Sequence, residues 1–119
     1  MDGFDELLLK TIDQTIRYVL GNHNALIIYN YLESKSCPIR EIPTKLDLFS
    51  EELRNLIGVG RGQILGAPII LENAIVEALA SELGLKLENE SIVFEDRIRR
   101  LKERYNKGRS RPFLKPRIE

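Results

Sequence analysis

Apolar side chains recur at intervals of three and four residues along most of this chain, and no other feature constrains its fold as much. This spacing places them on one face of an α-helix, whereas no pair of alternating segments joined by a tight turn indicates a sheet. The first predicted helix covers about residues 4–20, and its apolar stripe comprises Leu8, Ile12, Ile16 and Val19. The sequence therefore predicts an all-α fold: a single-domain bundle of four to five helices with an extended basic C-terminal arm.

The second predicted helix is unusual because it is apolar almost all round. Gly21 ends the first helix in a left-handed conformation, and Asn22 or Asn24 is expected to cap the second with its side-chain oxygen. The segment ALIIYNYL, residues 25–32, follows, and the helix continues to about residue 34. A helix of this kind is either central in a bundle or shared with a partner.

The third predicted helix lies between a proline-rich break and a glycine-rich segment. Cys37-Pro38 ends the second helix, and one loose turn is expected before Pro43 because the residue before a proline avoids helical geometry. Asp47 or Ser50 is expected to cap the third helix, and Gly58 is expected to end it.

The fourth predicted helix runs from Ala67-Pro68 to Gly84, with the proline in the first turn, where its missing N–H costs nothing. Its apolar arc is wide, and the middle of that arc comprises Leu71, Ile75 and Leu79. We expect the second and fourth helices to expose apolar surface in a monomer, because both are too apolar to be buried on one side only.

The fifth predicted helix begins after Asn89 or Ser91, and the basic arm follows Asn106. Its apolar side comprises Phe94, Ile98, Leu101 and Tyr105. The chain is accordingly divided into a helical bundle core, residues 1–95, and a basic helix with the C-terminal arm, residues 96–119.

Length and composition exclude several classes of protein. The 119 residues, 43% of them hydrophobic and 30% charged, suit one globular domain. No apolar run approaches the roughly 20 residues of a membrane span, and the acidic N-terminus does not resemble a signal peptide. The single Cys37 fits a reducing cytoplasm, and the single His23 excludes a multi-histidine metal site. We expect a cytoplasmic protein with no metal, no cofactor and no membrane association.

The formal net charge of zero conceals an acidic body and a basic tail. Residues 1–96 hold 8 Lys and Arg against 16 Asp and Glu, whereas residues 97–119 hold 10 against 2. Two explanations compete: the tail binds an anionic partner elsewhere, or it binds the acidic body of its own chain or of a sister subunit.

The glycine-rich segment GVGRGQILGAP, residues 58–68, is a weak phosphate-binding candidate. Its backbone N–H groups and Arg61 could bind a phosphate at the start of the fourth helix; the glycines concerned are Gly58, Gly60 and Gly62. A P-loop needs lysine and then serine or threonine after its last glycine, but Gln63 and Ile64 stand there. The segment is therefore interpreted as a helix end and a chain reversal, with a small residual possibility of nucleotide binding.

Glu72 falls inside the apolar arc of the fourth helix. A carboxylate in that position is either a general acid or base, or one half of an ion pair, with Arg61 or Arg54 as the candidate partner. No nucleophile or second catalytic group is spaced near it, so the ion pair is favoured. We find no catalytic set and do not expect an enzyme.

The basic tail combines paired and unpaired charges. Acid-first pairs four residues apart are expected for Glu95 with Arg99, Asp96 with Arg100, and Glu103 with Lys107. The residues without such a partner are Arg97, Lys102, Arg104, Arg109, Arg111, Lys115 and Arg117. Interleaved with Tyr105 and Phe113, they could bind and stack on nucleic acid, or they could bind an acidic protein surface.

Several segments carry a family resemblance. They are LLLKTIDQTI (residues 7–16), LGNHNALIIYNYLE (20–33), EIPTKLDLFSEELRNLIGVG (41–60) and ENAIVEAL (72–79). From about residue 4 to 83 the sequence resembles a small family of archaeal helical modules, the Nitrosopumilus-type output domain. In that family the glycine pair leads almost directly to the helix with the glutamate, whereas GRGQILGAPIIL lengthens this join here.

This resemblance implies an all-helical module without established enzymatic activity, found alone or attached to sensory proteins. The expected function is a non-catalytic protein-interaction or signal-output module that forms a homo-oligomer or binds a protein partner. The alternative is a nucleic-acid-binding accessory protein that uses the basic C-terminal segment.

Overall fold

The chain forms an all-α bundle, as the sequence predicts. The computed structural model describes residues 3–57, 67–86 and 93–109, and no strand occurs within these ranges. The elements are α1 (Gly3–Leu20), α2 (Asn22–Ser34), the short 3-10 helix η1 (Ile39–Thr44), α3 (Leu46–Ile57), α4 (Ala67–Leu83) and α5 (Phe94–Arg109). The sequence predicts that the arm follows Asn106, but α5 continues to Arg109. The term "C-terminal arm" hereafter denotes residues 110–119.

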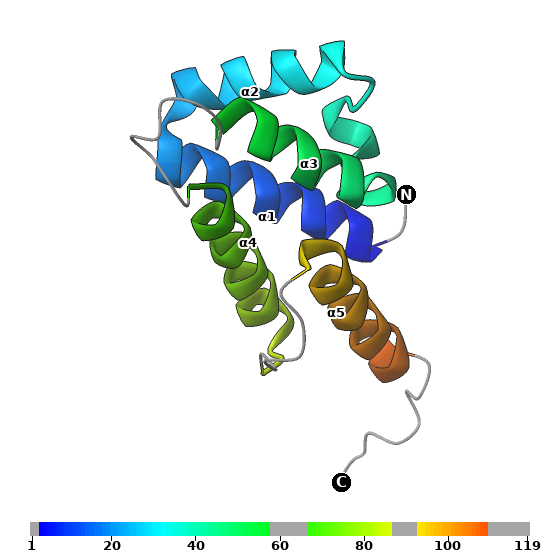
Figure 1. The fold of residues 1–119 in the computed structure, drawn as a ribbon. Coiled ribbons are helices and arrows are strands. Elements are labelled where there is room, and N and C mark those ends of the chain that lie inside the picture. Colours follow the sequence, from blue (N-terminus) through cyan, green and yellow to red (C-terminus); the bar gives the residue numbers. More distant parts are fainter. Residues whose placement is uncertain (1–2, 58–66, 87–92, 110–119) are drawn as a thin grey trace, which may run out of the picture.

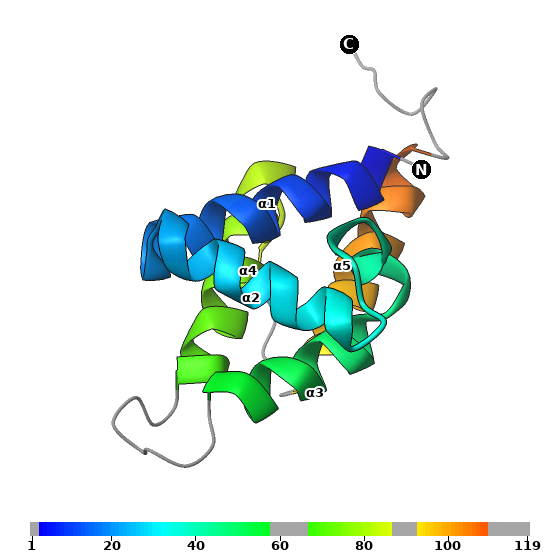
Figure 2. The ribbon, with the colours of Figure 1, turned by 90° about the horizontal axis from the view of Figure 1, so that it is seen from above.

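The helices form two groups that meet through α1 and α3. In Figure 1, α1, α2 and α3 occupy the upper part of the molecule, and α4 and α5 descend from them. Figure 2, seen from above, shows α1, α2 and α3 running roughly side by side. Contacts join α1 to α2, α4 and η1, while α3 contacts α2, α4 and α5. Helix α2 therefore lies at the edge of the bundle and not at its centre.

The core consists mainly of the predicted apolar stripes, although Val19 of α1 and Tyr105 of α5 are not fully buried. Leu8, Ile12 and Ile16 of α1 are fully buried, but Val19 is 43% exposed because it sits in the last turn, beyond the cover of the neighbouring helices. At the other end of the chain, Ile98 of α5 belongs to the same buried cluster. The core thus extends past residue 95 into the basic helix.

Glycines with positive φ end two helices, as the sequence indicates. Gly21, with a φ of 93°, is the only residue between α1 and α2, and its N–H donates to the Arg17 carbonyl over 2.9 Å. Gly84, with a φ of 69°, follows α4. Both conformations suit a residue without a Cβ.

The asparagine cap predicted for α2 is wrong. Gly21 occupies the cap position, and no side chain caps the helix start. The side-chain amide of Asn24 instead donates to the Leu20 carbonyl over 2.9 Å, and the side-chain oxygen of Asn22 accepts from Arg17 over 3.2 Å. Because only one residue separates the two helices, both side chains lie close enough to form hydrogen bonds with the last turn of α1.

The cap predicted for α3 is also wrong. The helix begins one residue before Asp47, so this carboxylate lies in the first turn and accepts from the Leu48 N–H over 2.8 Å. Ser50 points into the protein and is buried. The loose turn expected before Pro43 is confirmed as η1, which includes Pro43 and buries Ile42.

No helix in the described ranges is both long and apolar enough to cross a membrane.

Candidate functional site

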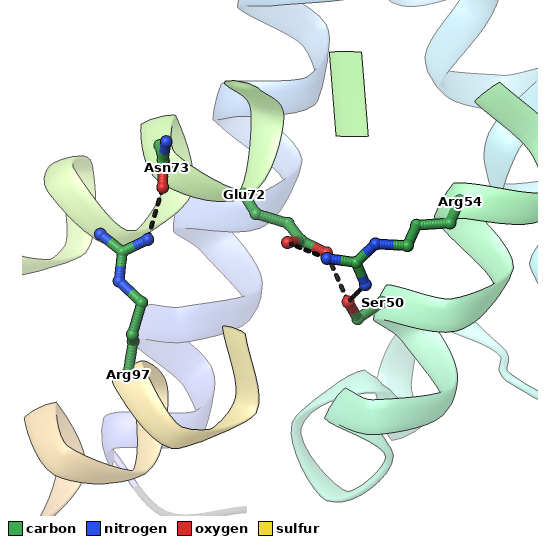
Figure 3. Close-up of polar contacts among 5 residues, drawn as sticks. All are labelled: Ser50, Arg54, Glu72, Asn73 and Arg97. Carbon is green, nitrogen blue, oxygen red and sulfur yellow. Dashed lines mark hydrogen bonds and ion pairs between the residues drawn. The ribbon is translucent and has the colours of Figure 1, made fainter. Parts of the chain in front are cut away.

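Glu72 of α4 lies at the centre of a buried polar cluster between α3 and α4. Its carboxylate accepts a hydrogen bond of 2.5 Å from the Ser50 hydroxyl and one of 3.2 Å from Arg54 Nη2 (Figure 3). Arg54 Nη1 also donates to Ser50 Oγ over 2.5 Å. The Glu72 side chain is only 4% exposed, whereas that of Arg54 is 48% exposed.

The local sequence explains how α3 supplies both partners. Ser50 and Arg54 are four residues apart, so they lie on the same face of the helix, one turn from each other. Glu72 sits on the facing side of α4, among the buried Leu71, Ile75 and Val76. The ion pair predicted for Glu72 forms with Arg54, while its other candidate partner, Arg61, lies outside the described residues.

This cluster is organised to hold two helices together. Each carboxylate oxygen of Glu72 accepts a hydrogen bond from α3, so both oxygens of the buried carboxylate have a donor. A buried carboxylate that retained only one of these partners would be strongly destabilising. Within the described residues, no group of three or more His, Cys, Asp and Glu side chains could hold a metal ion.

An acid-rimmed groove opens beside the cluster, between α3 and the start of α5. Its volume is about 450 Å³, and its lining includes Asp47, Glu51 and Glu95. Val93, 51% exposed, supplies apolar surface, and the buried Phe94 also lines the groove. Arg54 also lines the groove, but its guanidinium is already bound to Glu72. We call this the α3–α5 groove.

The sequence interpretation missed this groove. The sequence predicts a helix cap for Asp47 and a pair with Arg99 for Glu95, whereas the structure pairs Arg99 with Asp96 and places Glu95 on the groove wall. The available signal was the spacing of Asp47 and Glu51, which are four residues apart and share one face of α3. What the spacing does not reveal is that α5 packs beside that face.

The basic residues of α5 make contacts within the chain. Arg97 donates to the side-chain oxygen of Asn73 on α4 (Figure 3). Lys102 forms an ion pair of 3.3 Å with Asp5 of α1, and Arg104 donates to the Lys86 carbonyl over 2.6 Å. Three of the seven predicted binding residues therefore also attach α5 to the bundle.

The other predicted binding residues cannot be placed in this way. The side chain of Arg109 and the whole of Arg111, Lys115 and Arg117 lie outside the described residues. The same holds for the weak phosphate candidate, Gly58, Gly60, Arg61 and Gly62. The interpretation of these residues remains a prediction.

Apolar side chains are exposed on α2 and α4, as expected. On α2, Leu26 is 54% exposed and Ile27 is 47% exposed, and on α4 Ile70 is 60% exposed. At the end of α1, next to the α2 start, Tyr18 is 91% exposed. The inner side of α2, in contrast, is buried through Ala25, Ile28 and Leu32.

A second polar cluster links α1 to α2. The Tyr29 hydroxyl donates to the Asp13 carboxylate over 2.7 Å, and Arg17 Nε binds the same oxygen over 2.9 Å. Burial, the hydrogen bond to Asp13 and the negative charge of Asp13 raise the pKa of Tyr29 above its ordinary value, although the nearby Arg17 opposes this. The cluster fastens the polar edge of α2 to the bundle.

The remaining reactive side chains show no catalytic arrangement in the described part of the chain. His23 is exposed near the start of α2. Cys37 is fully buried, and this burial raises the pKa of its thiol.

No known protein family, no curated protein and no solved structure matches this chain. The resemblance to archaeal output modules therefore stays a prediction from the sequence.

Proposed function

We propose that this chain is a non-catalytic protein-interaction or signal-output module that associates with itself through the outer face of α2. The observation that carries this proposal is the exposure of Leu26 and Ile27 on a helix whose other side is fully buried. The sequence left two positions open for so apolar a helix, the centre of the bundle or a shared interface. Because α2 lies at the edge of the bundle (Figure 1), the shared interface is favoured.

The position of these side chains supports a contact between two α2 helices. At about 100° per residue, Leu26 and Ile27 point to opposite flanks of the outer face, with the exposed Asn30 between them. The resulting surface is broad, and a twofold-symmetric contact requires only such a self-complementary patch. Each exposed apolar residue covered by a second copy would add roughly 1 kcal/mol to association.

The contacts of Glu72 support a non-catalytic role. A general acid or base has to reach a substrate, but both oxygens of this carboxylate face α3 and its side chain is 4% exposed. The free and buried Cys37 is in keeping with a cytoplasmic location. The resemblance to archaeal helical output modules supports a prokaryotic, archaeal-type protein.

The contacts of α5 favour this function over the nucleic-acid-binding alternative. Arg97, Lys102 and Arg104 would have to give up partners within the chain to bind phosphates. Gel shifts on single- and double-stranded nucleic acid test the alternative, since phosphate contacts produce a steep dependence on salt. Salt-sensitive binding that disappears in an Arg111→Glu/Arg117→Glu variant would replace the proposal made here.

Sedimentation velocity across a concentration series tests the self-association. The full chain is expected to form a dimer or larger species as its concentration rises. The variants Leu26→Lys and Ile27→Lys should each weaken association at least about tenfold, because the new charge is desolvated in the interface. The matched control is Gln14→Lys on the exposed side of α1. A wild-type chain that stays monomeric at every concentration would contradict the proposal.

A further inference from the structure

We propose that the α3–α5 groove binds the C-terminal arm, residues 110–119, of a second copy of the chain. The inference rests on the self-association proposed above, but it concerns a different surface. The groove and the α2 outer face lie on different helices, and the end of α5 and α2 lie at opposite ends of the molecule (Figure 1). The two contacts therefore do not compete.

The chemistry of the groove calls for a cationic segment with apolar side chains. Its three carboxylates, Asp47, Glu51 and Glu95, face only one cationic group in the lining, the guanidinium of Arg54. That guanidinium is bound to Glu72 and so compensates a charge behind the groove. The half-exposed Val93 provides an apolar surface beside these charges.

The sequence of the arm has the matching composition. In SRPFLKPRIE the adjacent Phe113 and Leu114 are flanked by Arg111, Lys115 and Arg117. Prolines at 112 and 116 restrict the backbone, which lowers the entropy lost when a segment binds in an extended form. Electrostatic complementarity between an acidic groove and a basic segment favours this partner and speeds the encounter.

Reach favours the arm of a second copy. From Phe94 to Arg109, α5 carries the chain about 22 Å away from the apolar end of the groove. Phe113 follows four residues later, and four fully extended residues cover at most about 14 Å. Within one chain the backbone of Phe113 therefore ends short of the start of α5, whereas the arm of a second copy is not limited in this way.

Photo-crosslinking of the full chain tests the inference. Benzoylphenylalanine in place of Phe113 is expected to give a covalent species of twice the monomer mass on irradiation. Its crosslinks, mapped by mass spectrometry, should fall on residues 47–55 or 93–95. The double variant Asp47→Lys/Glu51→Lys should lower the yield at least about fivefold by reversing the charge of the rim. The exposed Glu77→Lys on α4, outside the groove, is the matched control and should leave the yield unchanged.

A second probe separates failure of this inference from failure of the proposed function. Benzoylphenylalanine in place of Asn30 reports on the α2 outer face alone. Crosslinked dimers from position 30, without groove crosslinks from position 113, would overturn the inference and leave the proposed self-association standing. Crosslinks from position 113 that occur only within one chain would likewise overturn it, and the absence of dimers from both probes would overturn both proposals.

Discussion

Two regions depart from the usual distribution of polar and apolar groups in opposite ways. One is the cluster between α3 and α4, and the other is the outer face of α2. The first places a carboxylate, Glu72, inside the protein, and the second places Leu26 and Ile27 outside it. The buried carboxylate is fully met by Ser50 and Arg54 of the same chain. The exposed side chains have no comparable cover in the described bundle. The inner exception is thus complete within one chain, whereas the outer one is the basis of the proposed self-association.

The largest expected effect tests whether the inner cluster is complete. Arg54→Leu should lower the free energy of unfolding by about 4 kcal/mol, because it leaves the Glu72 carboxylate buried without its cation. Urea denaturation followed by circular dichroism measures this. The double variant Arg54→Leu/Glu72→Leu is the control, since removing both charges should restore most of the loss. A single variant as stable as the wild type would show that solvent, and not Arg54, compensates the charge of the Glu72 carboxylate.

A matched pair of neighbours on α2 tests the outer face. Ile28, 4% exposed, faces the core, and Ile27, 47% exposed, faces outward. Ile28→Ala should cost about 3 kcal/mol of unfolding free energy through lost burial and the cavity left behind. Ile27→Ala should change the stability of the monomer by less than about 0.5 kcal/mol. Denaturation has to be measured at concentrations where sedimentation shows monomer. Equal losses would mean that α2 is buried on both sides within one chain.

The same contrast describes what the sequence could predict. Periodicity identified the five α-helices of the described residues, and it placed Glu72 inside the apolar arc of α4, because both follow from the position of a residue on its own helix. It also identified the excess of apolar side chains on α2. Such properties are local, and the later packing does not change them.

The features that the sequence left undetermined depend on which helices become neighbours. The sequence shows no partner four residues away for Arg97, Lys102 and Arg104, because their partners, on α4, on α1 and after α4, are distant in the sequence. The α3–α5 groove arises only when the acidic face of α3 meets Val93 and Phe94. The caps were misplaced for a related reason, since a shift of one residue in a helix start changes what Asn22, Asn24 and Asp47 can reach.

The smallest expected effect concerns the polar link that holds α2 from the inside. Tyr29→Phe should lower the unfolding free energy by about 1 kcal/mol at neutral pH, because it removes a half-exposed hydrogen bond to Asp13. The folded pKa of Tyr29 is raised above its ordinary value of 10.0, so this contribution is fully present below pH 10.0 and is lost as the pH rises from there through the folded pKa. Wild-type stability should therefore fall more steeply above that pH than the stability of Tyr29→Phe. Tyr31→Phe is the companion variant for the link between α2 and α3, because Tyr31 binds Glu52 of α3 and its pKa is also raised. If Tyr29→Phe and the wild type lost stability in parallel up to strongly alkaline pH, the bond to Asp13 would not contribute to holding α2, and the inner side of this helix would depend on apolar packing alone.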